Sequence, residues 1–267
     1  MTTPIQPHDR QPIPGIKDTI AISSGKGGVG KSTITANLAV TLAGRGLRIG
    51  LADTDIYGPN IPGMLGVSGR PQVAGDSQRL LPPEAHGLKV VSMGLLIDPG
   101  TPVIWRGPML AKMVAQFLFN VEWGELDLLL LDLPPGTGDV QITLTQSAPL
   151  TGAVIVTTPS PIALEDVRRG VEMFRQSEVP ILGLVENMSH FDCPSCQQRT
   201  PIFGAGRGER TAKDFDMPLL GQVPIDTGLR AGADSGQPAA AAASQSAAAV
   251  ALDQIADSLL ATLATDA

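Results

Sequence analysis

A glycine-rich segment with a lysine and two hydroxyl residues at fixed spacing carries the strongest chemical signal in the sequence. Residues 25–33 read GKGGVGKST and satisfy the pattern G-x-x-x-x-G-K-S/T. Such a loop turns backbone N–H groups toward a polyphosphate, and the helix that follows presents its N-terminal end to the same anion. We expect Lys31 to reach the β- and γ-phosphates, Ser32 to ligate Mg²⁺ and Thr33 to contact the α-phosphate. The expected nucleotide-binding residues are Gly25, Lys26, Gly27, Gly28, Val29, Gly30, Lys31, Ser32 and Thr33.

Carboxylates follow two apolar runs that read as strands. Asp53 and Asp55 close the run LADTD, and Asp132 closes the run DLLLLD. An aspartate at a strand end can simply cap the turn that follows. With a phosphate loop upstream, we instead expect Asp132 to hold Mg²⁺ through water, as in the Walker B arrangement. The loop 134–139 is then placed to sense the γ-phosphate.

The two cysteines of the chain, Cys193 and Cys196, form a C-x-x-C pair in a polar segment. Two thiolates can share one metal or cluster. A pair of buried structural thiols and a redox couple are alternatives, although a redox couple favours a cysteine at a helix N-terminus. With His190 as a third ligand, a zinc site would still be one ligand short. Two copies of the chain would supply four thiolates, which suits either a four-iron, four-sulfur cluster or zinc.

Apolar runs that alternate with helical patterns predict the fold. The expected strands and helices indicate an α/β, three-layer, doubly wound P-loop NTPase fold with a mainly parallel central sheet. Residues 1–17 hold four prolines and read as a flexible arm, followed by one domain over 18–267. Two irregular stretches, 56–87 and 188–218, interrupt the pattern, and the second contains the cysteines. The expected strands are 18–24, 47–53, 88–93, 127–133, 152–158, 180–187 and 219–223, and the expected helices are about 31–44, 107–121, 138–147, 161–177 and 248–264.

Composition narrows the classes of function. The 267 residues carry 19 basic and 26 acidic side chains, a net charge of −7. This balance disfavours nucleic acid and anionic lipid as partners. We find no stretch that reads as a membrane span and no signal peptide, so we expect a cytoplasmic protein with reduced thiols. The apolar face of the C-terminal helix is expected to pack on the sheet, because the helix's polar side is acidic.

The phosphate loop resembles a particular group of ATPases. The form KGGVGKS, with its additional Lys26, is similar to the deviant Walker A loop of the MinD and ParA positioning ATPases and the nitrogenase iron protein. This resemblance implies an ATP-dependent homodimer in which Lys26 crosses to the partner's nucleotide; the alternative is an exposed lysine at a loop tip. It also implies that Asp55 orients the attacking water, that Asp53 lies nearer the metal shell, and that Asn187 recognises the base.

Five motifs in order extend the resemblance. GKGGVGKS, DTDIYGPNIP, PVIWRGPM, DLPPGTGD and ENMSHFDCPSC together look like the Mrp/ApbC family of iron–sulfur cluster carrier ATPases, over roughly residues 13–230. The resemblance implies that Cys193 and Cys196 of two subunits bridge a labile [4Fe–4S] cluster. It further implies that ATP binding and hydrolysis by Lys26, Lys31 and Asp55 accompany cluster loading or transfer, with apo iron–sulfur proteins and an assembly scaffold as transient partners.

Three other functions remain to be weighed. A positioning ATPase would need a basic tail or a basic face, and Asp253, Asp257 and Asp266 make the tail acidic. An electron-transfer ATPase like the nitrogenase iron protein would need a cysteine near the phosphate-sensing loop, and 132–148 contains none. A dimer held together by a structural zinc ion remains an alternative, because cysteine thiolates bind zinc as well as iron.

Overall fold

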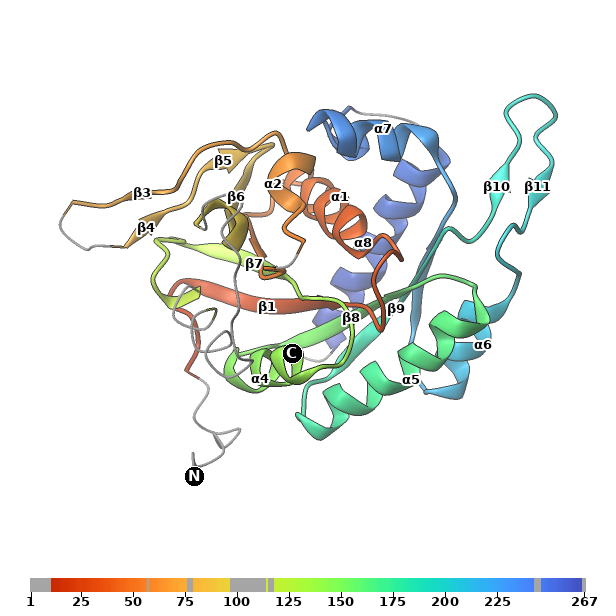
Figure 1. Cartoon of the computed structure of the whole chain (residues 1–267), viewed down its shortest axis with the longest axis horizontal. Helices are drawn as coiled ribbons and strands as arrows, with labels where there is room; N and C mark the ends of the chain where they lie inside the picture. The colour runs from red at the N-terminus through yellow and green to blue at the C-terminus, as the bar shows by residue number, and fades with distance from the viewer. Residues whose placement is uncertain are drawn as a thin grey trace.

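A mostly parallel sheet forms the centre of the molecule. The computed structural model describes residues 11–56, 58–75, 79–96, 114, 118–242 and 246–265. Its eight-stranded sheet has the order β12–β9–β8–β1–β7–β2–β6–β5, and only β5 runs antiparallel to its neighbour (Figure 1). The strands are β1 (Ile16–Ser23), β2 (Ile49–Asp53), β5 (Glu84–Ala85), β6 (Leu88–Ser92), β7 (Leu126–Asp132), β8 (Gly152–Thr157), β9 (Ile181–Asn187) and β12 (Leu219–Val223).

The register of the central strands determines where the functional side chains meet. Asp53 on β2 pairs directly with Asp132 on β7, and Ile22 on β1 pairs with Asp132 from the other side. Because parallel strands all end at the same edge, the segments that leave β1, β2 and β7 lie together there. The sheet therefore brings the glycine loop and both carboxylates to one edge.

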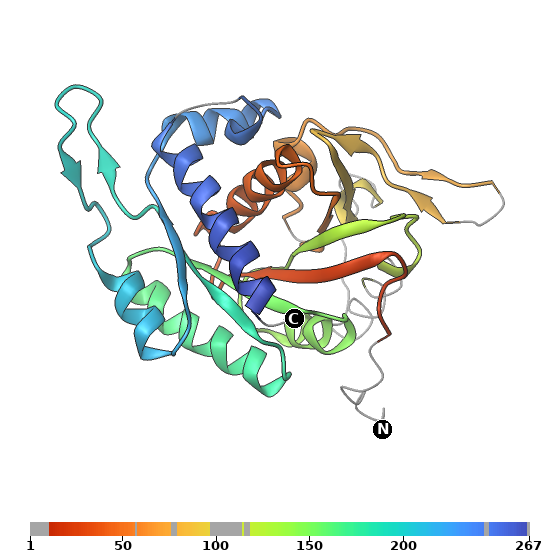
Figure 2. The same ribbon diagram turned by 180° about the vertical axis from the view of Figure 1, so that it is seen from behind.

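Helices cover both faces of the sheet, which confirms the predicted three-layer fold (Figures 1 and 2). Alternate residues of β1 point to opposite layers: Ile20 and Ile22 join one core cluster, and Ala21 joins the other. One layer contains α1 (Lys31–Gly44), α2 (Ile61–Met64), α7 (Thr227–Ser235), η3 (Ala239–Ala242) and α8 (Ala247–Thr265); the other contains α4 (Asp139–Ser147), α5 (Pro161–Gln176) and α6 (Arg207–Asp214).

The C-terminal helix packs as predicted, but its composition corrects one expectation. Among the described residues, α8 alone has the length and mean hydropathy that a membrane span would need, so the expectation of no such stretch is wrong. Its apolar face nevertheless lies against β12 and α1, with Leu252, Ile255 and Leu259 fully buried. On the polar side of α8, Asp253 and Asp257 form ion pairs with Arg45, the residue that follows α1.

The structure also refines several predicted boundaries. β1 begins at Ile16, and Ile13 is only 3% exposed, so residues 13–17 belong to the packed structure rather than to the expected arm. The irregular stretches contain short elements: β3 (Gln72–Val73) with β4 (Leu80–Leu81), and β10 (Phe191–Asp192) with β11 (Arg199–Thr200). Strands of two residues are too short to show an alternating pattern. Most of the predicted helix 107–121 lies outside the described residues, and so do residues 1–10 of the expected arm.

Candidate functional site

The loop between β1 and α1 has the shape that a phosphate cradle needs. Gly28 and Gly30 adopt positive φ angles of 81° and 82°, which side chains disfavour. A Cβ atom at Gly30 would also collide with Nδ2 of Asn187. No side chain caps the N-terminus of α1, so the first N–H groups of this helix remain available to an anion.

Asp132 receives hydrogen bonds from three side chains at the start of α1. Its Oδ2 lies 2.8 Å from Lys31 Nζ and accepts a 2.6 Å hydrogen bond from Ser32 Oγ. Thr35 Oγ1 donates to Oδ1 at 2.7 Å. The carboxylate is fully buried. The structure thus brings together Lys31, Ser32 and Asp132, as the sequence predicts.

Asp53 is a second buried carboxyl group beside Asp132. Ser92 Oγ donates to its Oδ2 at 2.9 Å, and the backbone N–H of Asp55 donates to its Oδ1 at 3.1 Å. Burial, and then the neighbouring charge of Asp132, raise the pKa of Asp53 to about 7. The set of carboxylate and hydroxyl oxygens at Asp53, Asp132 and Ser32 fits Mg²⁺, which prefers oxygen ligands and would favour the ionised form of these carboxyls.

A cavity of about 240 Å³ opens over the glycine loop. Asp55, Asn60, Met64 and Pro135 face the loop across it, and every loop residue from Lys26 to Thr33 contributes to its wall. Asp55 is largely buried, and its Oδ1 accepts a hydrogen bond from Gly58 N at 3.2 Å. Gly25 does not line this cavity; it lies against Asp166 of α5, where a Cβ atom would collide.

Asn187, at the end of β9, lies behind the loop. Its Nδ2 donates to the backbone oxygen of Val29 at 2.9 Å. The contact uses one amide hydrogen to support the loop, and recognition of the base by Asn187 remains a prediction. It also ties β9 to the phosphate loop, six residues before Cys193.

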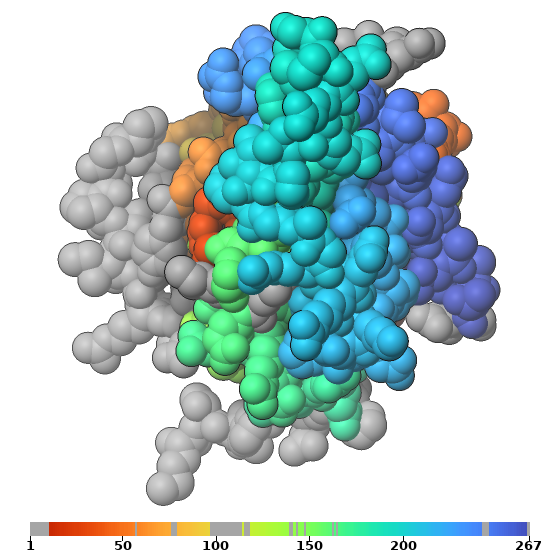
Figure 3. Space-filling model, turned by 90° about the vertical axis from the view of Figure 1, so that its right-hand side faces the viewer, coloured from red at the N-terminus to blue at the C-terminus, as the bar shows by residue number. Residues whose placement is uncertain are grey.

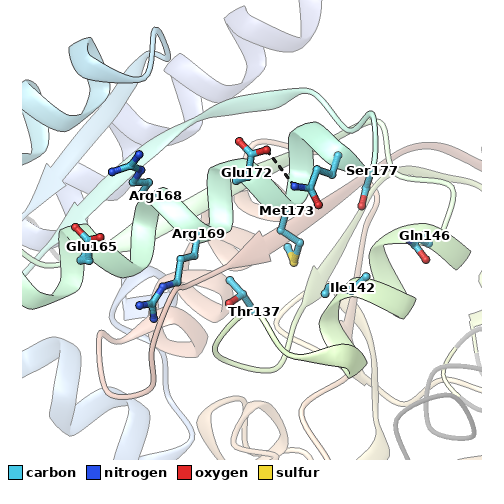
Figure 4. A pocket seen from close by; sticks show the side chains of 10 residues that line it. Thr137, Ile142, Gln146, Glu165, Arg168, Arg169, Glu172, Met173 and Ser177 are labelled. Atoms are coloured by element: carbon cyan, nitrogen blue, oxygen red, sulfur yellow. Dashed lines mark hydrogen bonds between the residues drawn. The ribbon is translucent and has the colours of Figure 1, made fainter.

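A larger groove lies elsewhere, between α4 and α5. It has a volume of about 380 Å³ and is lined by Arg168, Arg169, Glu165, Glu172 and Met173 among others (Figure 4). Thr137 also lines this groove, and it belongs to the loop predicted to sense the γ-phosphate. The groove has no glycine loop and no buried cluster of carboxylates, so the smaller cavity is the better nucleotide site.

The cysteines lie in the turn of the β10–β11 hairpin, which projects from the body of the molecule (Figures 1 and 3). The turn is closed by hydrogen bonds from Gln197 N to Cys193 O, at 2.8 Å, and from Cys193 N to Gln198 O, at 3.1 Å. Cys196 is exposed and Cys193 is half-buried. This geometry excludes the reading of two buried structural thiols.

The turn favours the thiolate form of one cysteine. Hydrogen bonds from the backbone N–H groups of Cys196 and Ser195 lower the pKa of the Cys193 thiol. His190 is engaged elsewhere: its ring nitrogens lie 2.9 Å from Ser189 Oγ and 3.4 Å from Asp192 Oδ2. Over the described ranges, no three His, Cys, Asp or Glu side chains form a group that could hold a metal ion. The described residues of one chain therefore offer a metal two thiols at this turn and no third ligand.

Two supporting residues were not predicted from the sequence. Thr35 bonds Asp132, and its spacing of four residues from Lys31 places both on one face of α1, a signal that was available. Ser92 bonds Asp53 because the register of β2 and β6 pairs these two residues. That pairing joins segments about 40 residues apart and has no local signal in the sequence.

Comparison with known proteins identifies the family to which the chain is similar. The family described as ParA, "NUBPL iron-transfer P-loop NTPase", matches residues 15–260. A relative from Synechocystis named iron-sulfur cluster carrier protein is 53% identical over 255 residues, which cover 94% of this chain and 72% of the relative.

Solved structures agree with this match. A nucleotide-binding protein from Archaeoglobus fulgidus, in complex with ADP, is 40% identical, with a TM-score of 0.76 over 87% of this chain and 92% of the other. The cell division ATPase MinD of Pyrococcus furiosus, at 24% identity and a TM-score of 0.70 over 91% of this chain and 98% of the other, shares the fold.

Proposed function

The chain belongs to the family of NUBPL iron-transfer P-loop NTPases, and from this premise we propose that it is an ATP-hydrolysing carrier of iron–sulfur clusters. Two copies hold one [4Fe–4S] cluster between them as cargo and pass it to apo iron–sulfur proteins, after loading from an assembly scaffold. The name of the Synechocystis relative supports the carrier role. Because the thiols must stay reduced, the cytoplasm is the proposed location.

The phosphate site supports the hydrolytic half of this proposal. Lys31 and the uncapped N-terminus of α1 bind the β- and γ-phosphates of ATP, the substrate. Ser32 and Asp132 hold Mg²⁺, with Asp53 behind them, and the metal neutralises phosphate charge when bound. Asp55 faces the loop across the cavity and orients the attacking water. Lys26, at the loop tip, reaches the nucleotide of the second copy.

The observation that carries the proposal is the cysteine hairpin. It presents two thiols, one of them with a lowered pKa, on an exposed turn without a third ligand among the described residues. A four-thiolate coordination sphere is then completed by a second copy of the chain. The same sphere suits zinc, which makes a zinc-stapled ATPase dimer the second candidate.

Anaerobic reconstitution with iron and sulfide tests the cargo. We expect about one four-iron cluster per dimer, loss of the cluster in Cys193→Ala and Cys196→Ala, and retention in Ser195→Ala, a matched control in the same turn. Each cysteine change deletes two of the four ligands, whereas the phosphate site is untouched and ATP hydrolysis continues. If the double cysteine variant still activates an apoprotein as the parent does, the carrier function is wrong. Zinc without iron at the four thiolates would favour the stapled dimer.

The assignment of Asp55 and Lys26 has its own test. Asp55→Asn is expected to bind ATP but to hydrolyse it ~10²-fold more slowly, because the carboxylate that orients water is lost. Mixing this variant with Lys26→Ala is expected to restore part of the activity in mixed dimers. Hydrolysis by Asp55→Asn at the parent rate would refute the role of Asp55. A lack of rescue where mixed dimers form would show that Lys26 acts within its own chain.

A further inference from the structure

Two consecutive large apolar side chains stand in solvent beside the cysteine hairpin. Ile202 is 54% exposed and Phe203 is 45% exposed. They occupy the two central positions of a tight turn, which the hydrogen bond from Gly204 N to Pro201 O closes at 3.2 Å. A turn of this kind directs both side chains outward, and it follows β11 directly.

The turn is fixed against the body of the protein. Gly204 has a φ of 112°, and a Cβ atom there would lie 3.3 Å from Arg207 Nε and 3.4 Å from the backbone oxygen of Pro159. Pro159 follows β8, which neighbours β1 in the sheet, so the turn rests at the edge of the sheet that carries the phosphate loop. The exposed pair therefore lies in the short segment between the cysteine hairpin and α6, next to this edge of the sheet.

Other exposed apolar side chains in the described ranges lie apart from both sites. Val73 and Leu81 belong to the β3–β4 hairpin, at the other end of the molecule in Figure 1, and Val250 lies on α8. Single apolar residues on a surface need no explanation. Two adjacent exposed apolar residues beside a pair of thiols that lacks further metal ligands do need an explanation.

We propose that Ile202 and Phe203 form the apolar contact between two copies of the chain that shields the cluster from water. This inference rests on the proposed function. Two thiols per chain require a second hairpin to approach the first, and a two-fold axis brings the same residues of both copies to the contact. Each copy contributes its apolar pair, and an apolar shell around a metal site restricts the access of solvent.

The charge of the hairpin permits this self-contact. Residues 190–203 contain one acidic and one basic side chain, Asp192 and Arg199. They pair with each other, with Arg199 Nε 3.2 Å from Asp192 Oδ1. Like charges that face each other across an interface repel and disfavour association. Because the two charges of each hairpin pair with each other, two identical hairpins can meet without such repulsion.

The double variant Ile202→Ser/Phe203→Ser tests the contact, with Val250→Ser as the matched control, because Val250 is 49% exposed on a distant helix. ATP binding and thermal unfolding verify that each protein is folded. After reconstitution we expect the double variant to hold less cluster and to show a larger monomer fraction in analytical ultracentrifugation, where the parent and control are cluster-bound dimers. Its cluster should pass to a chelator about tenfold faster or more, as for loss of a central interface contact.

Two outcomes would overturn the inference. Dimerisation and cluster retention equal to those of the parent would show that the pair does not join the copies. Normal dimers and retention combined with slow transfer to an apoprotein would show that the pair docks the recipient instead. The proposed carrier function is judged separately, since it depends on the cysteine variants whatever the behaviour of Ile202 and Phe203.

Discussion

The phosphate site and the cysteine hairpin are built in opposite ways. At the phosphate site, Asp132 is fully buried and bonded by Lys31, Ser32 and Thr35. At the hairpin, Cys196 is exposed, and the hydrogen bonds to the Cys193 thiol come from its own turn. One site is buried at the edge of the sheet where the parallel strands end, and the other projects away from the body of the molecule (Figures 1 and 2).

This difference in burial shows which of the two sites one chain can organise by itself. Burial strengthens each charge interaction at the phosphate edge, and it makes any missing partner costly. The hairpin pays no such penalty, because water satisfies its exposed groups. A site that is buried within the fold is organised before its ligand arrives, whereas the hairpin has one exposed and one half-buried thiol, and the described residues of the chain offer a metal no third ligand there.

Lys31→Ala attacks the buried site and should produce the largest effect. ATP hydrolysis is expected to fall by at least ~10²-fold, because the phosphate charge loses its main cation. The change also leaves the Asp132 carboxylate without its ion pair, which should lower the free energy of unfolding by about 3 kcal/mol. Steady-state hydrolysis and urea unfolding measure both effects. Lys17→Ala, on the exposed start of β1, is the control; a rate for Lys31→Ala within tenfold of that control would contradict the assignment.

Asp53→Asn should change how stability depends on pH. Because burial raises the pKa of Asp53 to about 7 from an ordinary value of 3.8, the folded chain holds a proton between these values that the unfolded chain has lost. The free energy of unfolding of the parent therefore falls as pH rises from 4 to 7, by up to about 4 kcal/mol. The asparagine variant lacks this loss, so its free energy of unfolding relative to the parent should rise from pH 4 to pH 7 and then level off, in urea unfolding without nucleotide or Mg²⁺. Parallel pH profiles would rule out the raised pKa.

Arg199→Ala changes the exposed site and should have the smallest effect. The ion pair with Asp192 lies in solvent, and surface pairs contribute little to stability. The pKa of Asp192, which Arg199 lowers, should return toward its ordinary value. The midpoint of thermal unfolding is expected to stay within about 2 °C of the parent. A fall several times larger, measured by calorimetry, would mean that the hairpin supports the core, and the contrast between the two sites would fail.

Much of the fold was predictable because its signals are local. Long apolar runs such as DLLLLD indicate buried parallel strands, and the glycine loop with Lys31 indicates both a turn and its ligand. Helix α7 was not predicted, since Gly228 and Gly232 weaken its helical pattern. A signal was present at Asp226, whose side chain accepts hydrogen bonds from Gly228 N and Leu229 N and caps the helix.

The parts that could not be predicted depend on tertiary structure. The contact of Ser92 with Asp53 follows from strand register, and the burial that raises the pKa of Asp53 follows from packing. Likewise, a C-x-x-C spacing does not reveal whether its turn is exposed. The roles of Asp55, Lys26 and Asn187 remain predictions, because they concern a bound nucleotide and a second chain.

The contact between Asn187 and Val29 sets a geometric limit on the proposed dimer. Only residues 188–192 separate Asn187 from Cys193, and six residue steps of extended chain span about 20 Å. Covalent geometry alone therefore confines Cys193 to a sphere of that radius around Asn187, whatever the conformation of the hairpin. As long as Asn187 stays against the phosphate loop, each copy's loop lies within reach of the shared thiolates on a tether that cannot lengthen. Any displacement of the hairpin during loading or release is a swing about the end of β9, and its amplitude has this upper bound.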